Sequence, residues 1–178
     1  MERSRSRAPL FWAVILSVVT LDVITKLIAV RMLVPERIPH EVLGEYVRFT
    51  LVYNPGAAFG LNVGEYSRWV FIALTIGALV ILGRLYRQTR PGDTARLIAL
   101  GLVCAGALGN LIDRLRSARG VVDFIDVGAA GWRWPTFNVA DIAVSTGAFL
   151  LAWVLWGEDR QAAATAARAE PAHLQGDG

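Results

Sequence analysis

Two aspartates, Asp123 and Asp141, lie at the same edge of a strongly apolar chain. Asp123 stands between two apolar runs, and Asp141 lies at the start of the last hydrophobic segment. Two carboxyl groups a few ångströms apart cannot both ionise readily, so they share a proton near neutral pH. The ionised group can accept a proton from water while the protonated group hydrogen-bonds a peptide carbonyl. Together the two aspartates predict acid–base peptide hydrolysis without a metal or a covalent intermediate.

The surroundings of the two carboxyl groups predict different roles for them. Asn138 precedes Asp141 by three residues, which suits an N-cap with Asp141 in the first turn of the helix. The positive end of that helix favours the charged form of Asp141. Asp123 lies among Val121, Val122 and Phe124 and should resist ionisation more. Either aspartate alone would be an ordinary helix-terminal or loop carboxylate; their occurrence together indicates a site.

A second charged pair, Asp22 and Lys26, lies one helical turn apart inside the first apolar segment. Residues at this spacing share a helix face. Ionisable side chains deep in a membrane segment normally face the protein interior and pair with a partner. Lys26, the only lysine in the chain, could instead extend its ammonium group outward. An ion pair that fixes the first helix and a role in supporting the site are both compatible with this pattern.

Two further stretches could contact a peptide substrate. In the stretch 54–60, Asn54 offers amide donors and acceptors, Gly56 suits a type II turn, and small Ala58 permits close backbone approach. A loop that only turns the chain is the alternative. In the third apolar segment, Gly106, Asn110, Asp113 and Arg114 share a helical face by their spacing. Arg114 could hold Asp113, a substrate carbonyl or a lipid phosphate, or could simply anchor the helix at the headgroups.

The composition indicates a polytopic membrane protein. Hydrophobic residues make up 54% of the chain and the mean hydropathy is +0.45, values that exclude an ordinary soluble domain. The net charge of +3 does not indicate nucleic-acid binding, because the arginines flank apolar segments. We expect one membrane-embedded domain over 1–156 and a disordered cytoplasmic tail over 157–178. Each predicted span approaches the length that a bilayer requires, and the spans are 10–33, 69–86, 95–115 and 139–156.

Basic residues and strand patterns predict how these spans are arranged. Arginines gather at the N-terminus and in the link between the second and third spans, which places both segments in the cytoplasm. Because the chain has four predicted spans, the C-terminus returns to the cytoplasm as well. The stretches 46–53, 121–127 and 132–137 are rich in β-branched and aromatic residues, with a turn at 128–131. They predict a small antiparallel sheet on the membrane at the other face.

The remaining reactive side chains predict no further chemistry. Cys104, the single cysteine, lies in an apolar segment and is expected to pack there. His40 and His173 lack the spacing of metal ligands, so we expect no metal. Ser145 has no histidine in reach along any plausible face, which argues against a serine mechanism.

Five blocks in order resemble the lipoprotein signal peptidase family, also called signal peptidase II. They extend from the first to the fourth span and are Asp22-Val23-Ile24-Thr25-Lys26, Asn54-Pro55-Gly56-Ala57-Ala58-Phe59-Gly60, Gly106 to Arg114, Val121-Val122-Asp123-Phe124 and Phe137-Asn138-Val139-Ala140-Asp141. One departure is Val23, where the family often has glutamine.

The resemblance implies an intramembrane aspartic endopeptidase of the bacterial inner membrane, with its site at the outer face. Such enzymes remove the signal peptide from prolipoproteins just before a diacylglyceryl-modified cysteine, and globomycin inhibits them by occupying the space between the aspartates. Asp123 and Asp141 match the catalytic pair. The matching substrate-site or supporting positions are Asp22, Lys26, Asn54, Gly56, Ala58, Asn110, Asp113, Arg114 and Asn138. The implied fold is a four-helix membrane bundle with an outer β-cradle and a short interfacial helix, without a cofactor; we expect a monomer in contact with membrane lipids.

Two rival functions are open to a sequence of this kind. A small transporter or ion pathway could use Asp22, Lys26 and Arg114 as relay groups, although such pathways usually line the midplane with polar residues and broken helices. Here only Asp22 is deep. A membrane scaffold without catalysis is the third possibility, but it leaves the paired aspartates unexplained.

Overall fold

Helices dominate the computed structural model, which describes residues 7–56 and 64–169. The helices are α1 (Arg7–Met32), the 3-10 helix η2 (Gly64–Tyr66), α2 (Ser67–Gln88), α3 (Thr94–Arg116) and α4 (Val139–Ala169). The strands are β1 (His40–Leu43), β2 (Val47–Asn54), β3 (Val121–Ala129) and β4 (Trp132–Arg133). Within the described ranges, α1, α2 with η2, α3 and α4 are long and apolar enough to cross a membrane, which confirms the prediction of four membrane-length helices.

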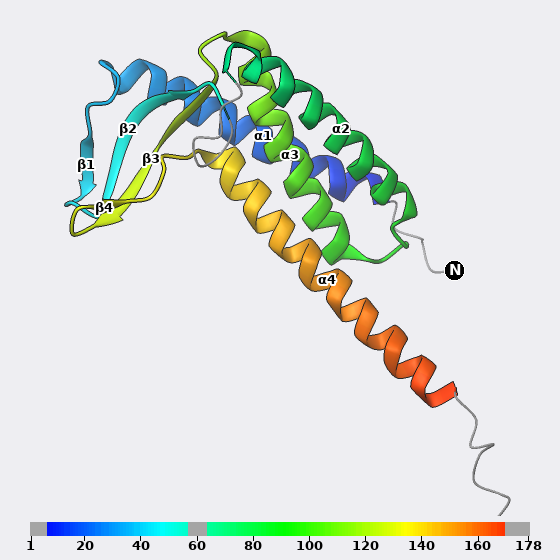
Figure 1. Ribbon diagram of the computed structural model, residues 1–178. Helices are drawn as coiled ribbons and strands as arrows, with labels where there is room; N and C mark the ends of the chain where they lie inside the picture. The colour runs from blue at the N-terminus through cyan, green and yellow to red at the C-terminus, as the bar shows by residue number, and fades with distance from the viewer. Residues whose placement is uncertain (1–6, 57–63, 170–178) are drawn as a thin grey trace, which may run out of the picture.

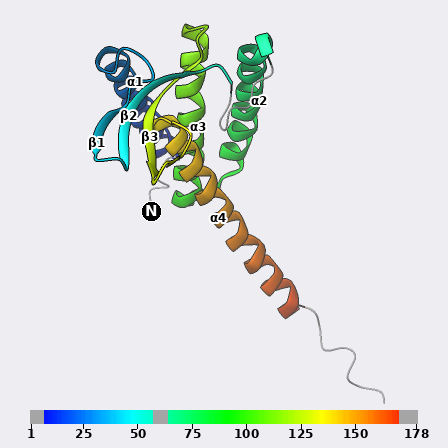
Figure 2. The same cartoon turned by 60° about the vertical axis from the view of Figure 1, so that its left-hand side comes forward.

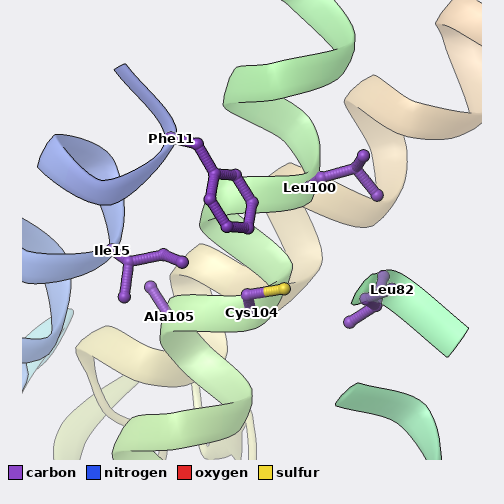
Figure 3. Packing of buried hydrophobic residues seen from close by; sticks show 6 residues of the cluster. All are labelled: Phe11, Ile15, Leu82, Leu100, Cys104 and Ala105. Atoms are coloured by element: carbon purple, nitrogen blue, oxygen red, sulfur yellow. The ribbon is translucent and has the colours of Figure 1, made fainter. Parts of the chain in front are cut away.

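The α3 helix is the centre of the bundle. It packs against α1, α2 and α4, and its residues supply much of the buried core. In Figure 3, Leu100, Cys104 and Ala105 of α3 lie between Phe11 on α1 and Leu82 on α2. Cys104 is buried in this cluster, as its apolar surroundings predict.

The strands form one antiparallel sheet in the order β1-β2-β3-β4. The sheet extends from one end of the bundle, while the α2–α3 link and the C-terminal half of α4 lie toward the other (Figures 1 and 2). β2 and β3 pair with Tyr53 opposite Val122 and Asn54 opposite Val121. Leu51, Val122 and Phe124 pack with Ala29 and Leu33 near the end of α1, so the sheet is fixed to the bundle by a hydrophobic contact.

Two predicted elements differ from the structure in extent. The prediction of disorder from residue 157 onward is wrong for residues 157–169, which continue α4; residues 170–178 lie outside the described part of the chain. Arg96 of α3 pairs with Glu158, and the alanine-rich sequence after it has high helix propensity. The strand predicted over 132–137 is only two residues long, because Pro135 lacks an N–H for the ladder; Phe137 makes an isolated bridge with Ile125.

Candidate active site

A cavity of about 460 Å³ at the junction of the sheet and the bundle contains both Asp123 and Asp141. Asp123 comes from β3 and Asp141 from the first turn of α4, so folding brings together two residues that are far apart in the sequence. The remaining wall is supplied by β2, α3, α4 and the segment after β4, through Asn54, Asn110, Arg114, Val121, Trp134, Pro135, Thr136, Phe137, Ile142, Val144, Ser145 and Thr146.

Asn138 connects the two carboxyl groups. Its side-chain amide donates to Asp123 Oδ1 at 2.7 Å. Its side-chain oxygen accepts from the Asp141 backbone N–H at 2.9 Å, and its own backbone N–H donates to Asp141 Oδ2 at 3.2 Å. This reciprocal pair of bonds is the helix cap predicted from the spacing of the two residues. Asn138 is fully buried, so its amide is held in one orientation between the aspartates.

Two further asparagines complete the hydrogen bonds of the pair. Asn110 Nδ2 donates to Asp141 Oδ1 at 2.8 Å, and Asn54 Nδ2 donates to Asp123 Oδ2 at 3.2 Å. Each of the four carboxyl oxygens therefore faces an amide N–H. Neutral amides can orient two carboxyl groups without adding a charge that would fix both of them in the ionised form.

Burial makes Asp123 the carboxyl group that is harder to ionise. Its side chain is 3% exposed, and desolvation, followed by the nearby charge of Asp141, raises its pKa from the ordinary value to about 7. The hydrogen bonds from Asn54 and Asn138 act in the opposite direction but are outweighed. This matches the expectation that Asp123 resists ionisation among its apolar neighbours.

Lys26 is buried beside the site and does not extend its ammonium group outward, which corrects that part of the prediction. Its Nζ lies 2.8 Å from Asp22 Oδ2, 2.9 Å from Asp113 Oδ2 and 3.0 Å from Asn110 Oδ1. An ammonium group has three donors, so all three are used. The contact with Asn110 Oδ1 directs the amide N–H of Asn110 toward Asp141.

Asp22 reaches the start of α4 from the first helix. Its Oδ1 accepts from the Ala140 backbone N–H at 2.9 Å, one of the free donors in the first turn of α4. Gly109 of α3 makes this approach possible, since a Cβ there would lie 2.5 Å from Asp22 Oδ2 and 3.2 Å from the Ala140 Cβ. The predicted ion pair is therefore present, and Asp22 also joins the first helix to the start of α4.

Arg114 holds the backbone after Asn54. Its Nη2 donates to the Gly56 carbonyl at 2.7 Å, and its guanidinium lies 5.5 Å from the centre of the Phe71 ring. Asp113 instead pairs with Lys26 and accepts from the Val122 N–H at 3.1 Å, so Arg114 does not bind it. Ala58 lies outside the described residues.

Sequence reasoning missed several residues of the cavity wall. Ile142 and Ser145 follow Asp141 at spacings of one and four residues, and the four-residue spacing could have identified Ser145 as a neighbour on the same helix face. Trp134 and Thr136 flank Pro135, and this stretch of the sequence carried no such signal. Across residues 7–56 and 64–169, no group of three His, Cys, Asp or Glu side chains is arranged to hold a metal ion.

The fold and this cavity define a class of polytopic membrane protein with paired carboxyl groups at one end of a helical bundle. Residues 14–157 match the family described as "Signal peptidase (SPase) II". The chain belongs to the signal peptidase II family, as the five sequence blocks predicted.

Relatives and solved structures agree with this assignment. The chain is 39% identical over 155 residues to the lipoprotein signal peptidase of Mycobacterium avium (strain 104), covering 84% of this chain and 80% of that protein. It is 41% identical over 150 residues to that of Mycobacterium tuberculosis, covering 82% and 70%. A solved bacterial membrane enzyme, at 2.3 Å resolution, superposes with a TM-score of 0.77 at 30% identity, covering 85% of this chain and 90% of that one.

Proposed function

We propose that this protein is an aspartic endopeptidase that removes the signal peptide from lipid-modified bacterial prolipoproteins. The cut falls just before the diacylglyceryl-modified cysteine. Family membership supports the substrate class, because the relatives are lipoprotein signal peptidases. The observation that carries the aspartic mechanism is that Asp123 and Asp141 line one cavity and are both hydrogen-bonded to Asn138.

In this mechanism Asp141 is the base and Asp123 the acid. A water molecule attacks the scissile carbonyl carbon and gives a proton to the Asp141 carboxylate, while the Asp123 proton moves to the carbonyl oxygen. The resulting diol collapses as the C–N bond breaks: the proton on Asp141 passes to the leaving nitrogen, and one diol hydroxyl returns its proton to the Asp123 carboxylate as the new carboxyl group forms. The products are the carboxyl end of the signal peptide and a free amine on the lipidated cysteine. The raised pKa of Asp123 supports this division, because the group keeps its proton up to about pH 7.

Three side chains assist the reaction in this proposal. Asn110 and Asn138 hold the Asp141 carboxylate toward the cavity, and Arg114 fixes the Gly56 backbone at the cavity wall. Asp22, Lys26 and Asp113 act through these residues and do not line this cavity. Lys26 is paired with Asp22 and Asp113, whereas Arg114 is bonded to the Gly56 carbonyl. These separate contacts disfavour a relay in which Asp22, Lys26 and Arg114 pass an ion along one path.

We further propose that the protein acts as a monomer in the bacterial inner membrane, with both termini cytoplasmic and the site at the outer face. Arg84, Arg87, Arg90 and Arg96 lie in or next to the α2–α3 link. This link lies at the end of the bundle away from the sheet (Figure 1), which supports this orientation. The scissile bond of a lipid-anchored substrate then reaches the cavity at the outer interface.

Cleavage of a defined substrate tests the proposal. The purified protein in detergent micelles is given a diacylglyceryl-modified prolipoprotein and, separately, the unmodified form, and mass spectrometry locates any cut. The expected product begins at the modified cysteine, is not formed from the unmodified form, and is suppressed by globomycin. A folded protein that cuts neither substrate, or that cuts at another bond, would overturn the proposal.

A further inference from the structure

A second cavity, of about 240 Å³, lies back to back with the candidate active site. Side chains alternate across a strand, and this alternation separates the two spaces. Asn54 and Val121, which face each other across β2 and β3, line the first cavity; their chain neighbours Tyr53 and Val122, also opposite each other, line the second. The second cavity therefore has its own walls and is not an extension of the first.

The floor of this second cavity is apolar and belongs to the outer flank of α1. Val23, Leu27 and Val30 recur at helical spacing along it, and Leu27 is 44% exposed. Because α1 is one of the membrane-length helices, an open apolar flank on it meets lipid hydrocarbon rather than water. Lys26 of the same helix also lines the cavity, and its ammonium group is held by Asp22, Asp113 and Asn110.

The rim of the second cavity is cationic. Arg116, Ser117 and Arg119, at and just beyond the end of α3, line it. The Arg119 guanidinium lies 3.7 Å from the centre of the Tyr53 ring and is paired with Glu36, so it is held at the rim. Arg116 is exposed, and its side chain makes no hydrogen bond or ion pair with any residue in the described ranges.

One arginine of the rim is available to an anion. Asp113 and Lys26 also line the cavity and pair with each other at 2.9 Å, and Asp22 lies 2.8 Å from the same Lys26 ammonium group. Glu36 pairs with Arg119, so Arg116 is the rim arginine without an ion-pair partner among the described residues. A cationic rim above an apolar wall matches the two halves of a phospholipid: a phosphate and an acyl chain.

We propose that the second cavity binds an anionic phospholipid, with one acyl chain against Val23, Leu27 and Val30 and the phosphate between Arg116 and Arg119. This proposal stands on the α1 flank and the arginine rim and does not depend on the peptidase mechanism. An occupied site would brace the back of β2 and β3, the strands that carry Asn54 and Asp123 on their other face.

Photolabelling with a lipid of defined headgroup tests this site. The full-length protein is placed in phosphatidylcholine vesicles containing a small fraction of phosphatidylglycerol with a photoreactive acyl chain, and labelled peptides are mapped by mass spectrometry. Label is expected on α1 between residues 23 and 30. Arg116→Gln should reduce this labelling by about fivefold. One basic group near an anionic lipid surface contributes about 1 kcal/mol to binding, which corresponds to this change.

Matched variants separate the site from general lipid contact. Arg84→Gln changes an exposed arginine on α2, away from this cavity, and should leave the α1 label unchanged. Val23→Gln should weaken it by making the wall polar. Thermal unfolding of each variant confirms that it is folded.

Three results would overturn the proposal: equal α1 labelling by a photoreactive phosphatidylcholine, equal labelling of the Arg116→Gln and wild-type proteins, or label confined to other helices. Inorganic phosphate at millimolar concentration is added in a parallel reaction. If phosphate alone abolishes the labelling difference between the two headgroups, the rim binds a free anion and the lipid assignment is wrong.

Discussion

At the scale of single residues, Asn138 has the largest number of roles in the site. It donates to Asp123, caps α4 and receives the Asp141 carboxylate on its backbone N–H. The sequence allowed the cap to be predicted, because a cap depends on residues three apart in the chain. The contact with Asp123 depends on the packing of β3 against α4 and could be reached from the sequence only through the family resemblance.

The buried Asp123 carboxyl group predicts a pH dependence. Its pKa of about 7 lies above the ordinary value, so the protonated form persists up to neutrality and is lost above it. We therefore expect kcat to fall as the pH rises through about 7, measured on a lipidated substrate in micelles. A kcat that stays constant or rises from about pH 6 to about pH 9 would contradict the role of Asp123 as the acid.

Replacement of Asn138 should affect both stability and catalysis. Asn138→Ala removes the side-chain oxygen that caps α4, which costs about 1 kcal/mol. It also removes the amide donor to Asp123, for which we expect kcat to fall by about a hundredfold. Asp93→Ala is the matched control, since Asp93 caps α3 by accepting from the Arg96 N–H at 3.1 Å and does not line the cavity. Thermal unfolding and turnover are measured for both; similar kcat values in the two variants would refute the catalytic role of Asn138.

At the scale of elements, the length of the apolar segments allowed the four membrane-length helices to be predicted. Local sequence patterns did not predict structure that depends on contacts between elements distant in the chain. β1 was missed because all four of its residues are exposed and show no alternation. The burial of Lys26 was also missed, because its acceptors Asp113 and Asn110 come from α3, more than eighty positions along the chain. Such contacts follow from how helices pack and leave no local trace in the sequence.

Close packing of α1, α3 and α4 predicts that Gly109 cannot carry a side chain. Gly109→Ala would place its Cβ against Asp22 and Ala140, and we expect a loss of about 1–3 kcal/mol from overpacking. Gly83→Ala on α2 is the control, because a Cβ there meets nothing within 4 Å and alanine favours the helix. Unfolding in mixed micelles measures both changes. Equal stability of the two variants would show that α1 and α3 are not in this contact.

At the scale of the whole molecule, the α2–α3 link and the sheet lie at opposite ends of the bundle (Figure 1). Basic residues near membrane spans favour the cytoplasm, so the sheet and the aspartates should face outward. Single cysteines are introduced at exposed Glu41 in β1 and exposed Arg90 in the α2–α3 link, after Cys104 is replaced by alanine. In spheroplasts, an impermeant maleimide should label position 41 and should reach position 90 only after permeabilisation. The reverse pattern would place the site at the cytoplasmic face.

The catalytic role of the paired carboxyl groups is tested by single-turnover cleavage with substituted enzymes. Asp123→Asn and Asp141→Asn each keep the size of the side chain but remove the acid or the base. Asp126→Asn makes the same change on β3, where Asp126 accepts from Thr50 and Arg133 and does not line the cavity. We expect both dyad variants to lose cleavage while remaining folded, and Asp126→Asn to retain it. Cleavage at a wild-type rate by either folded dyad variant would show that the two aspartates are not the catalytic pair.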